Sequence, residues 1–498
     1  MIVDFRPHTR LVGETPIDLT SSVAPVVQAL TEDAADLDRL RLVCDWVQYR
    51  ENFRDVVELR PILSRRHATA RDPVPAPGTA RENHDDQVEI AVDLRRSSGL
   101  PLREVTAGRL REDAGHLVFL EDWCPGRESC VWEFNALYWS ALRSWEAASG
   151  RGYEQALPGG ESDARNRDAA ADLIRELFTV WDGLAASGGL PEELYVVELG
   201  VGNGNQARVF LDVFREIDRE RGRDYYRRLR YLMCDYSRNV LDTARENVAD
   251  HAARVSVFAM EATRPSASLG FLRDKAFLVY LSNVYDNLPT DEIAHIGGRT
   301  YRVETRAYLP TAEAADLAES VAASPEELPG LVRELLRLGP SLLSEAAPAH
   351  FADTWAAVEF WRRTWSLVRL KERYVPLGGL GRYPLAPSVS GDALRPLLEP
   401  GADVRMHVSN DALASFTDTL GLLHPFGTLV CHDLFVTDVQ EYRTSFRGPG
   451  KYDGSVVNWV NGPLLAQVGH RKGFDVGFAP FRHRSGTNIV TMTARARD

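Results

Sequence analysis

The stretch Tyr195-Val-Val-Glu-Leu-Gly-Val-Gly-Asn-Gly-Asn205 decides the fold of this chain. Its first five residues form an apolar, partly β-branched run that only Glu198 interrupts, which predicts a buried strand. Three glycines follow at alternate positions, and the segment 206–216 then repeats its apolar residues at the spacing of a helix. A strand, a glycine turn and a helix in this order form the first unit of a doubly wound α/β nucleotide site.

The glycines Gly200, Gly202 and Gly204 are spaced GxGxG, without the two-residue gap of the dinucleotide pattern GxGxxG. Glycine lets the backbone turn sharply and lets a ligand approach where a Cβ would clash. Glu198 stands two residues before the first glycine, and this acid together with the loop resembles motif I of the class I S-adenosylmethionine (SAM) methyltransferases. A carboxylate beside the loop suits the positive ammonium of SAM. An ordinary glycine turn is the alternative interpretation of the motif alone.

The composition is that of a globular enzyme with an acidic balance of charges. At 498 residues the chain is long enough for two or three domains. The net charge of −13 argues against nucleic acid or an anionic membrane as the main partner. The sequence has no signal peptide and no apolar run of about 18 residues, so we expect a cytoplasmic protein. The five cysteines lack metal-binding spacing, which predicts reduced thiols and no metal site.

Two further predicted strands each have an acidic residue at the carboxyl end. The segment 230–237 carries Asp235 near its end, and the strand predicted over 255–260 is followed by Glu261. Ligands of such sheets bind at the carboxyl ends of the strands, where an acid can chelate both ribose hydroxyls. The resemblance implies SAM as the cofactor and S-adenosyl-L-homocysteine as its product. The residues expected to bind SAM are Glu198, Gly200, Gly202, Gly204, Asp235, Tyr236, Ser237, Glu261, Ala262 and Ser282.

The order of the predicted elements gives an α/β fold with a Rossmann-like core of seven strands. A fourth strand begins at Phe277, a fifth covers 427–435, and the segments 474–478 and 487–494 form a closing antiparallel hairpin. The expected division of the chain is an N-terminal α+β region over 1–130, the core over 131–310 and 406–498, and a helical insertion over 311–405.

Local patterns add expectations outside the core strands. Apolar spacing predicts a helix over 36–48 and an aromatic-rich helix over 133–146 that packs on a core. Strands are predicted over 88–93 and 116–121, and a hairpin over 296–307. The glycine-rich loop 152–163 precedes a helix over 167–185, which places the loop to close over a cofactor. An ordinary connecting loop is an equally supported interpretation of this segment.

Four stretches carry a more specific resemblance. They are Val197-Glu-Leu-Gly-Val-Gly-Asn-Gly204, Ser282-Asn-Val-Tyr-Asp-Asn-Leu-Pro289, Gly427-Thr-Leu-Val-Cys-His-Asp433 and Asp453-Gly-Ser-Val-Val-Asn-Trp459. Over roughly residues 150–498 the chain resembles the MidA-type methyltransferases, a family that includes mitochondrial complex I assembly methyltransferases. Val284 stands where that family commonly has glutamate, and the acid expected near Asn458 is absent.

The resemblance implies N-methylation of an arginine guanidino group, either in a protein or in free arginine of specialised metabolism. A guanidinium is a poor nucleophile because it stays protonated with its charge delocalised. We therefore expect carboxylates to clamp it by charge-assisted hydrogen bonds, with Asp286 and Glu304 as the pair and Asn283 as an acceptor beside them. Further expected substrate-binding residues are Tyr153, Glu154, Asp163, His432, Asp433 and Asn458.

Two other functions stay open from the sequence. An O-methyltransferase of a small natural product would need a general base, for which His432 is best placed, although a core histidine is the favoured interpretation of that residue. The second open function is that of an assembly factor that binds SAM without catalysing methyl transfer. A homodimer is also expected, through the N-terminal region or a tryptophan-rich face of the insertion formed by Trp355, Phe360, Trp361 and Trp365.

Overall fold

The glycine-rich stretch lies in the middle of a seven-stranded sheet in the computed structural model of the chain. The structure describes residues 2–6, 20–33, 37–64, 87–112, 117–150, 152, 166–398, 402–443 and 448–497. The strands run in the order β22-β23-β17-β10-β7-β8-β9. They are β7 (Leu194–Leu199), β8 (Leu229–Asp235), β9 (Val255–Ala259), β10 (Ala276–Ser282), β17 (Leu423–Asp433), β22 (Phe474–Pro480) and β23 (Val490–Ala496).

The seven-stranded sheet is parallel except at one edge. β7 pairs in parallel with β8 and β10, and β9 and β17 continue the parallel pairing outward. β23 runs antiparallel to both β17 and β22, so the expected closing hairpin is present. β7 is central: the chain continues from it through β8 to β9 on one side and then returns to β10 on its other side. This reversal of strand order lies at the carboxyl end of β7, where the glycines begin.

Helices cover both faces of this sheet, as parallel strands require. They are α6 (Arg167–Ala186), α7 (Asn205–Glu220), α8 (Tyr225–Arg228), α9 (Arg238–Asn247), α10 (Pro265–Leu269), α15 (Asn410–Thr419) and α16 (Gly462–Arg471). Trp181 and Phe214 pack on one face with Val196 of β7. Phe416 and Leu464 pack on the other face with Val197. The α/β fold is therefore confirmed.

A second, ten-stranded mixed sheet has the order β1-β2-β4-β3-β13-β12-β11-β16, with β5 and β6 also pairing with β12. Its strands are β1 (Ile2–Arg6), β2 (Leu40–Asp45), β3 (Val57–Ile62), β4 (Gln87–Asp93), β5 (Leu117–Phe119), β6 (Cys124–Pro125), β11 (Glu292–Ile296), β12 (Arg299–Pro310), β13 (Arg369–Pro376) and β16 (Val404–His407). Helices α1 (Thr20–Glu32) and α2 (Leu102–Arg111) pack with its N-terminal strands.

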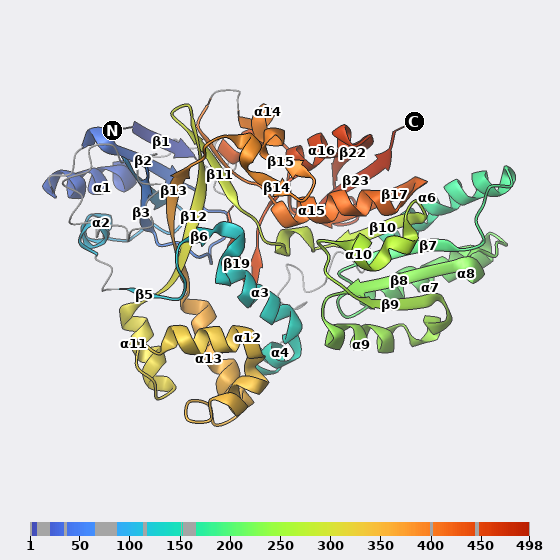
Figure 1. Cartoon of the computed structure of the whole chain (residues 1–498), viewed down its shortest axis with the longest axis horizontal. Coiled ribbons are helices and arrows are strands. Elements are labelled where there is room, and N and C mark those ends of the chain that lie inside the picture. Colours follow the sequence, from blue (N-terminus) through green and yellow to red (C-terminus); the bar gives the residue numbers. More distant parts are fainter. Residues whose placement is uncertain are drawn as a thin grey trace.

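A group of helices lies beside this second sheet (Figure 1). It consists of α3 (Cys130–Ser140), α4 (Leu142–Ser149), α11 (Thr311–Ser320), α12 (Leu328–Ala346) and α13 (Thr354–Leu367), which share one apolar cluster. The remaining short elements are β14 (Pro384–Ala386), β15 (Val389–Ser390), α14 (Arg395–Leu398), β18 (Phe435–Val436), β19 (Gly450–Tyr452), β20 (Ser455–Val457) and β21 (Val460–Asn461). No helix within the described ranges is long and apolar enough to cross a membrane.

Most local predictions are confirmed, but two are wrong. The predicted strands over 88–93 and 116–121 are β4 and β5, the aromatic helix is α3 followed by α4, and the hairpin is β11–β12. The segment 36–48 is not a helix, because its centre is strand β2, paired in parallel with β1 and β4. The stretch 311–405 is not purely helical, because after α13 it supplies strands β13 and β16 to the ten-stranded sheet.

The interior of the ten-stranded sheet contains paired charges. Arg54, Arg60 and Arg405 are each less than a tenth exposed, and all three contact the carboxylate of Glu372. Arg60 also donates to Glu89 at 2.9 Å, and Arg405 pairs with Glu292. These pairs join β3 and β4 to β13, β11 and β16 across the sheet. The N-terminal region and the later strands therefore share one ionic core.

Candidate functional site

The glycine loop after β7 adopts a backbone that favours glycine at three positions. Gly200, Gly202 and Gly204 have φ of +75°, +54° and +78°. A Cβ on Gly200 would lie 2.5 Å from Cγ2 of Val284, and one on Gly204 would lie 2.8 Å from Cα of Ala244. A Cβ on Gly202 would meet no atom within 4 Å. Gly200 and Gly204 are therefore fixed by packing, whereas Gly202 faces open space that a ligand can occupy.

Asp235 at the end of β8 lies directly against this loop. Its Oδ2 accepts a hydrogen bond from the Gly202 amide at 3.2 Å, and its Oδ1 accepts one from the Ser237 amide at 3.0 Å. Burial raises the pKa of Asp235. Ser237 caps α9 through its hydroxyl, and the amide of Met260 donates to the carbonyl of Asp235 at 2.9 Å. The ends of β7, β8 and β9 therefore meet at one point, as the sequence predicted.

The turn after β9 supplies the exposed acid Glu261 and the half-buried Ala262. The carboxylate of Glu261 interacts electrostatically with Tyr236. The Tyr236 hydroxyl donates to the carbonyl of Ala136 in α3 at 2.9 Å. This hydrogen bond ties the end of β8 to the helical group. Helix α3 consequently forms one wall beside the predicted SAM-binding residues.

Glu198 points into the sheet. It is 3% exposed, and the Tyr231 hydroxyl of β8 donates to its Oε2 at 2.6 Å. Burial raises the pKa of Glu198 to about 8, so this acid is mostly neutral at pH 7. A neutral, enclosed carboxyl does not supply the charge that would attract the ammonium of SAM. The role of Glu198 toward the ammonium of SAM therefore stays a prediction.

Asp433, at the end of β17, binds the loop that follows β10, whose last residue is Ser282. Its Oδ2 accepts hydrogen bonds from the amides of Val284 at 3.1 Å and Tyr285 at 2.8 Å. Asn283 has a φ of +52°, and its amide donates to the carbonyl of His432 at 2.9 Å. Asp433 is fully buried, so it acts here as the anchor of the loop rather than as a group open to a substrate.

The predicted carboxylate clamp is not formed, because its two acids are bound by different partners. Asp286 is buried, accepts from the Asn287 amide group at 2.7 Å and shares a hydrogen bond with Asp433. Burial, followed by the charge of Asp433, raises the pKa of Asp286 well above its usual value. Glu304 lies on β12 in the other sheet, where Arg373 donates to its Oε2 at 2.7 and 2.9 Å and Arg302 also pairs with it.

The other predicted substrate residues are placed as follows. His432 is buried, its Nδ1 lies 2.9 Å from the Thr491 hydroxyl, and its ring packs edge-on against Phe481, which is the geometry of a core histidine. Asn458 is buried and donates from Nδ2 to the carbonyl of Asp286 at 3.1 Å. Tyr153, Glu154 and Asp163 lie outside the described residues.

Helix α3 contributes two residues that sequence reasoning missed. The Asn135 side chain donates to the carbonyl of Asn287 at 2.9 Å, and the Trp139 indole donates to the Asn287 side chain at 3.1 Å. These bonds bring α3 against the loop after β10. The aromatic spacing of α3 predicted only a helix on a core, and no pattern linked it to residues about 150 positions later.

Asp411 is a second residue that the sequence did not reveal. It lies in the first turn of α15, is half-buried, and its amide donates to the carbonyl of Pro289 at 3.3 Å. Burial raises the pKa of Asp411 to about 6, with Arg127 opposing the shift and Asp291 and Glu261 adding to it. Among the described residues no side chain donates a hydrogen bond to its carboxylate. Asp411 therefore lies between the Glu261 turn and the loop after β10.

Comparisons with known proteins give structural likeness alone. No protein-family model matches the chain, and no curated protein matches it. A COG1565 superfamily member from Burkholderia thailandensis, bound to S-adenosyl-homocysteine, is 14% identical over 75% of this chain and 88% of its own, with a TM-score of 0.42. The 1,6-didemethyltoxoflavin-N1-methyltransferase from the same organism, with 1,6-didemethyltoxoflavin and S-adenosylhomocysteine bound, is 12% identical over 76% of this chain and 95% of its own, with a TM-score of 0.32. Likenesses at these scores assign neither a family nor a ligand to this chain.

Proposed function

We propose that the protein is a SAM-dependent methyltransferase with a Rossmann-like core of the MidA type. The observation that carries this proposal is the contact between the Gly202 amide and Asp235 at the carboxyl ends of β7 and β8. Ligands of open α/β sheets bind where the strand order reverses, and β7 is the strand at that reversal. The acids Asp235, Glu261 and Asp411 around this point disfavour phosphate and favour a ligand with ribose hydroxyls and a positive charge.

Each group at the strand ends has a defined task in this proposal. Asp235 holds the ribose hydroxyls, Tyr236 and Glu261 border the adenine, and the open backbone at Gly202 faces the methionine part. SAM, when bound, supplies a methyl group on a sulfonium leaving group. The chain then needs to hold the acceptor in line with that methyl, and most of the rate acceleration comes from this alignment.

The acceptor we propose is a guanidino group, in free arginine or in a protein. In this proposal Asp411 takes the place that the sequence gave to Glu304, because its carboxylate interacts electrostatically with Glu261 of the proposed site, whereas Glu304 is bound by two arginines. Asp286 contributes a buried carboxyl that is hydrogen-bonded to Asp433, with a pKa raised well above its usual value by burial. Asn287, fixed by Asn135 and Trp139, borders the same loop.

One observation favours a second candidate, an O-methyltransferase. The pKa of Asp411, raised to about 6, is that of a group able to act as a general base near neutral pH. The core position of His432 removes the base that the sequence suggested for this chemistry. A phenol or carboxylic acid acceptor would therefore have to lose its proton to Asp411 instead.

Incubation with methyl-labelled SAM separates these functions. The acceptors are free arginine, arginine-containing peptides and simple phenols, each with a heat-denatured protein control. Label transfer to arginine compounds supports the guanidino proposal, and transfer to phenols alone supports the O-methyltransferase. Absence of transfer to every acceptor, with SAM bound tightly, would support a SAM-binding protein without catalysis.

We also propose that the protein forms a homodimer, although the predicted tryptophan face is mostly internal. Phe360, Trp361 and Trp365 are buried in the helical core, whereas Trp355 is 58% exposed. Leu342 of α12 is 53% exposed. We expect a dimer at micromolar concentration by light scattering, weakened in Trp355→Ala. A monomeric wild-type protein would rule it out.

A further inference from the structure

Gln206 lies in the first turn of α7, directly after the glycine loop, and is buried without a hydrogen-bond partner. The residue is 7% exposed. Its Oε1 is closed off from solvent, and no group in the described part of the chain donates a hydrogen bond to it. An unpaired buried polar atom costs free energy, so it calls for a partner that the chain itself does not supply.

Gln206 is on the side of α7 that faces the ends of β7 and β8. It precedes Phe210 by four residues, so the two side chains share one face of the helix. The ring centroids of Phe210 and Tyr231 of β8 lie 5.4 Å apart, so this face packs on the sheet. Helix α7 starts at the carboxyl end of β7, and helical side chains lean toward the start of their helix. The Gln206 amide is therefore directed at the glycine loop, where Asp235 binds the Gly202 amide at 3.2 Å.

The same turn of α7 has two backbone amides without an acceptor. The amide of Asn205 donates to the Asn203 side chain at 3.1 Å. The amides of Gln206 and Ala207 donate to no group within the described ranges. Free amides and the dipole of a 16-residue helix favour a carboxylate at this end. The first turn thus offers an acceptor on the Gln206 side chain next to two donors on the backbone.

An α-amino-acid end matches these groups. Its ammonium supplies the donor that Oε1 of Gln206 lacks, and its carboxylate supplies the acceptor that the two amides lack. A phosphate would also accept from the amides, but the Asp235 carboxylate bonded to the same loop repels it. A neutral ligand would form weaker bonds, since hydrogen bonds to charged partners are about twice as strong.

We propose that Gln206 binds the amino-acid end of SAM, with its side-chain oxygen on the ammonium and the amides of Gln206 and Ala207 on the carboxylate. This assignment rests on the proposed function and deepens it, because it gives this end of the cofactor a residue that the sequence patterns did not single out. Holding this end fixes the position of the sulfonium along the carboxyl ends of the strands. Gln206 meets no acceptor, so its contribution to methyl transfer is the alignment of the cofactor.

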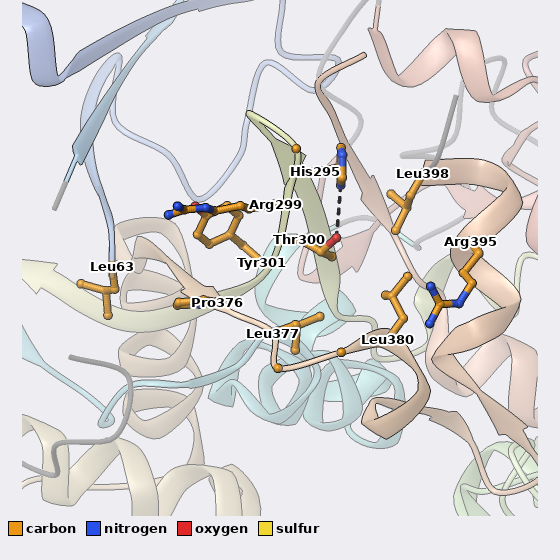
Figure 2. Close-up of a pocket in the computed structure, with 13 residues that line it drawn as sticks. Leu63, His295, Arg299, Thr300, Tyr301, Pro376, Leu377, Leu380, Arg395 and Leu398 are labelled. Carbon is orange, nitrogen blue, oxygen red and sulfur yellow. Dashed lines mark hydrogen bonds between the residues drawn. The ribbon is translucent and has the colours of Figure 1, made fainter. Parts of the chain in front are cut away.

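The cavity at the turn of the β11–β12 hairpin is a different part of the molecule. It measures about 330 Å³, and its lining includes Tyr301, Leu380 and Leu398. Figure 2 shows the arginines of this cavity, Arg299 and Arg395, on opposite sides. None of the lining residues belongs to the glycine loop or to α7. A change at Arg299 therefore serves as a control for a ligand held at α7.

Titration calorimetry on the full-length protein with three thioether nucleosides tests the assignment. S-Adenosylhomocysteine carries the whole amino-acid end, 5′-(3-aminopropylthio)-5′-deoxyadenosine keeps the ammonium alone, and 5′-methylthioadenosine has neither charge. The test variant is Gln206→Leu, which keeps the approximate size and removes the amide. We expect it to bind the first two nucleosides about tenfold more weakly than the wild type, and 5′-methylthioadenosine within about twofold of the wild type.

Stability without ligand separates binding from a structural role. Replacing an unpaired buried amide by an apolar group should leave the unfolding temperature of Gln206→Leu equal to or above that of the wild type. The assignment is overturned if the variant weakens binding of all three nucleosides equally, the result expected when the side chain only supports the fold. It is also overturned, with the proposed function left standing, if S-adenosylhomocysteine binds the wild type and Gln206→Leu alike. A wild type that binds none of the nucleosides overturns the proposed function and this assignment together.

Two control variants complete the measurement. Gln28→Leu removes an exposed glutamine of α1 whose side chain donates to Glu32, and Arg299→Gln changes the cavity of Figure 2. Both should bind all three nucleosides like the wild type. Weaker binding in Arg299→Gln would place the nucleosides in that cavity and overturn the assignment.

Discussion

The two sheets of this molecule are stabilised by different kinds of interaction. The seven-stranded sheet has apolar layers on both faces, and desolvation raises the pKa values of its buried acid Glu198 and its half-buried acid Asp235. In the ten-stranded sheet, burial alone would raise the pKa of Glu372, but Arg405, Arg54 and Arg60 outweigh it and hold that pKa well below its usual value. One sheet therefore encloses an acid, Glu198, that favours the neutral form, and the other encloses ionised pairs.

This difference separates a region built for a ligand from a region built to hold segments together. Neutral or weakly paired acids at strand ends are characteristic of functional sites. Ion pairs buried between strands remote in sequence cost desolvation, which only good geometry and several partners offset. Glu372 of β13 has three arginine partners: Arg60 of the neighbouring β3, Arg54 of the segment before β3, and Arg405 of β16. We therefore expect its loss to affect folding and the loss of Asp235 to affect binding.

The largest effect is expected for Glu372→Gln. Removing the charge leaves Arg54, Arg60 and Arg405 buried without their shared partner, which should lower the free energy of unfolding by about 3–5 kcal/mol. Urea unfolding followed by circular dichroism measures the change. Glu359→Gln is the control, because Glu359 is half exposed and pairs with Arg362 on the surface of α13, where a pair contributes about 1 kcal/mol or less. Equal effects in the two variants would contradict the ionic core.

The second prediction uses opposite pH dependence in the two sheets. The folded pKa of Glu198 is about 8, above its unfolded value, so its contribution favours folding at low pH and is lost as the pH rises from about 4.5 to 8. Glu198→Gln should remove this loss, on the order of 3 kcal/mol between pH 5 and pH 8.5. The low folded pKa of Glu372 acts in the other direction, since its contribution is lost as the pH falls.

Peptide-resolved hydrogen exchange measures the protection of the two sheets separately. The rates must be corrected for the intrinsic pH dependence of exchange. Protection of β7 and β8 should fall on going from pH 5 to pH 8.5 in the wild type and stay level in Glu198→Gln. Protection of β12 and β13 should fall instead as the pH drops below the usual pKa of a glutamate, because the folded pKa of Glu372 is lowered. A common pH profile for both sheets would show that their acids do not differ as described.

The third prediction concerns Asp411. Asp411→Asn should lower methyl transfer to the guanidino acceptor about tenfold and leave the affinity for SAM unchanged, because the carboxylate meets the acceptor only. Wild-type transfer should rise with pH through about 6 as this carboxylate ionises, and the variant should lack that rise. Asp475→Asn, on the exposed strand β22, is the matched control. A wild-type rate and pH profile in Asp411→Asn would remove Asp411 from the site.

Sequence reasoning worked where short-range patterns carry the structure. The apolar run before Gly200, the glycine spacing and the acid at Asp235 all lie within single strand–turn units, and the structure brings them together. It failed for β2, where the buried Arg41 pairs with Glu89 of β4 and with Asp403, both remote in sequence. A charged residue in an apolar run resembles one face of a helix until its partners are known.

The candidate site shows the same contrast between short-range sequence patterns and contacts made by segments distant in sequence. Asp286 and Glu304 are close in sequence, yet the chain turns from one sheet to the other between them, so their carboxylates have different partners. Asp411 and Asn135 reach the loop after β10 from positions more than a hundred residues away in sequence. Those contacts depend on the packing of whole elements, which no local spacing encodes.

Binding of SAM is the central claim, and calorimetry on three proteins tests it most directly. The wild type should bind SAM with one site per chain. Asp235→Ala should bind it about 10- to 100-fold more weakly, because hydrogen bonds to a charged group contribute about 1.5–3 kcal/mol. Asp242→Ala, an exposed acid on the neighbouring helix α9, should bind like the wild type. A wild type that does not bind SAM, or an Asp235→Ala variant with unchanged affinity, would contradict the account.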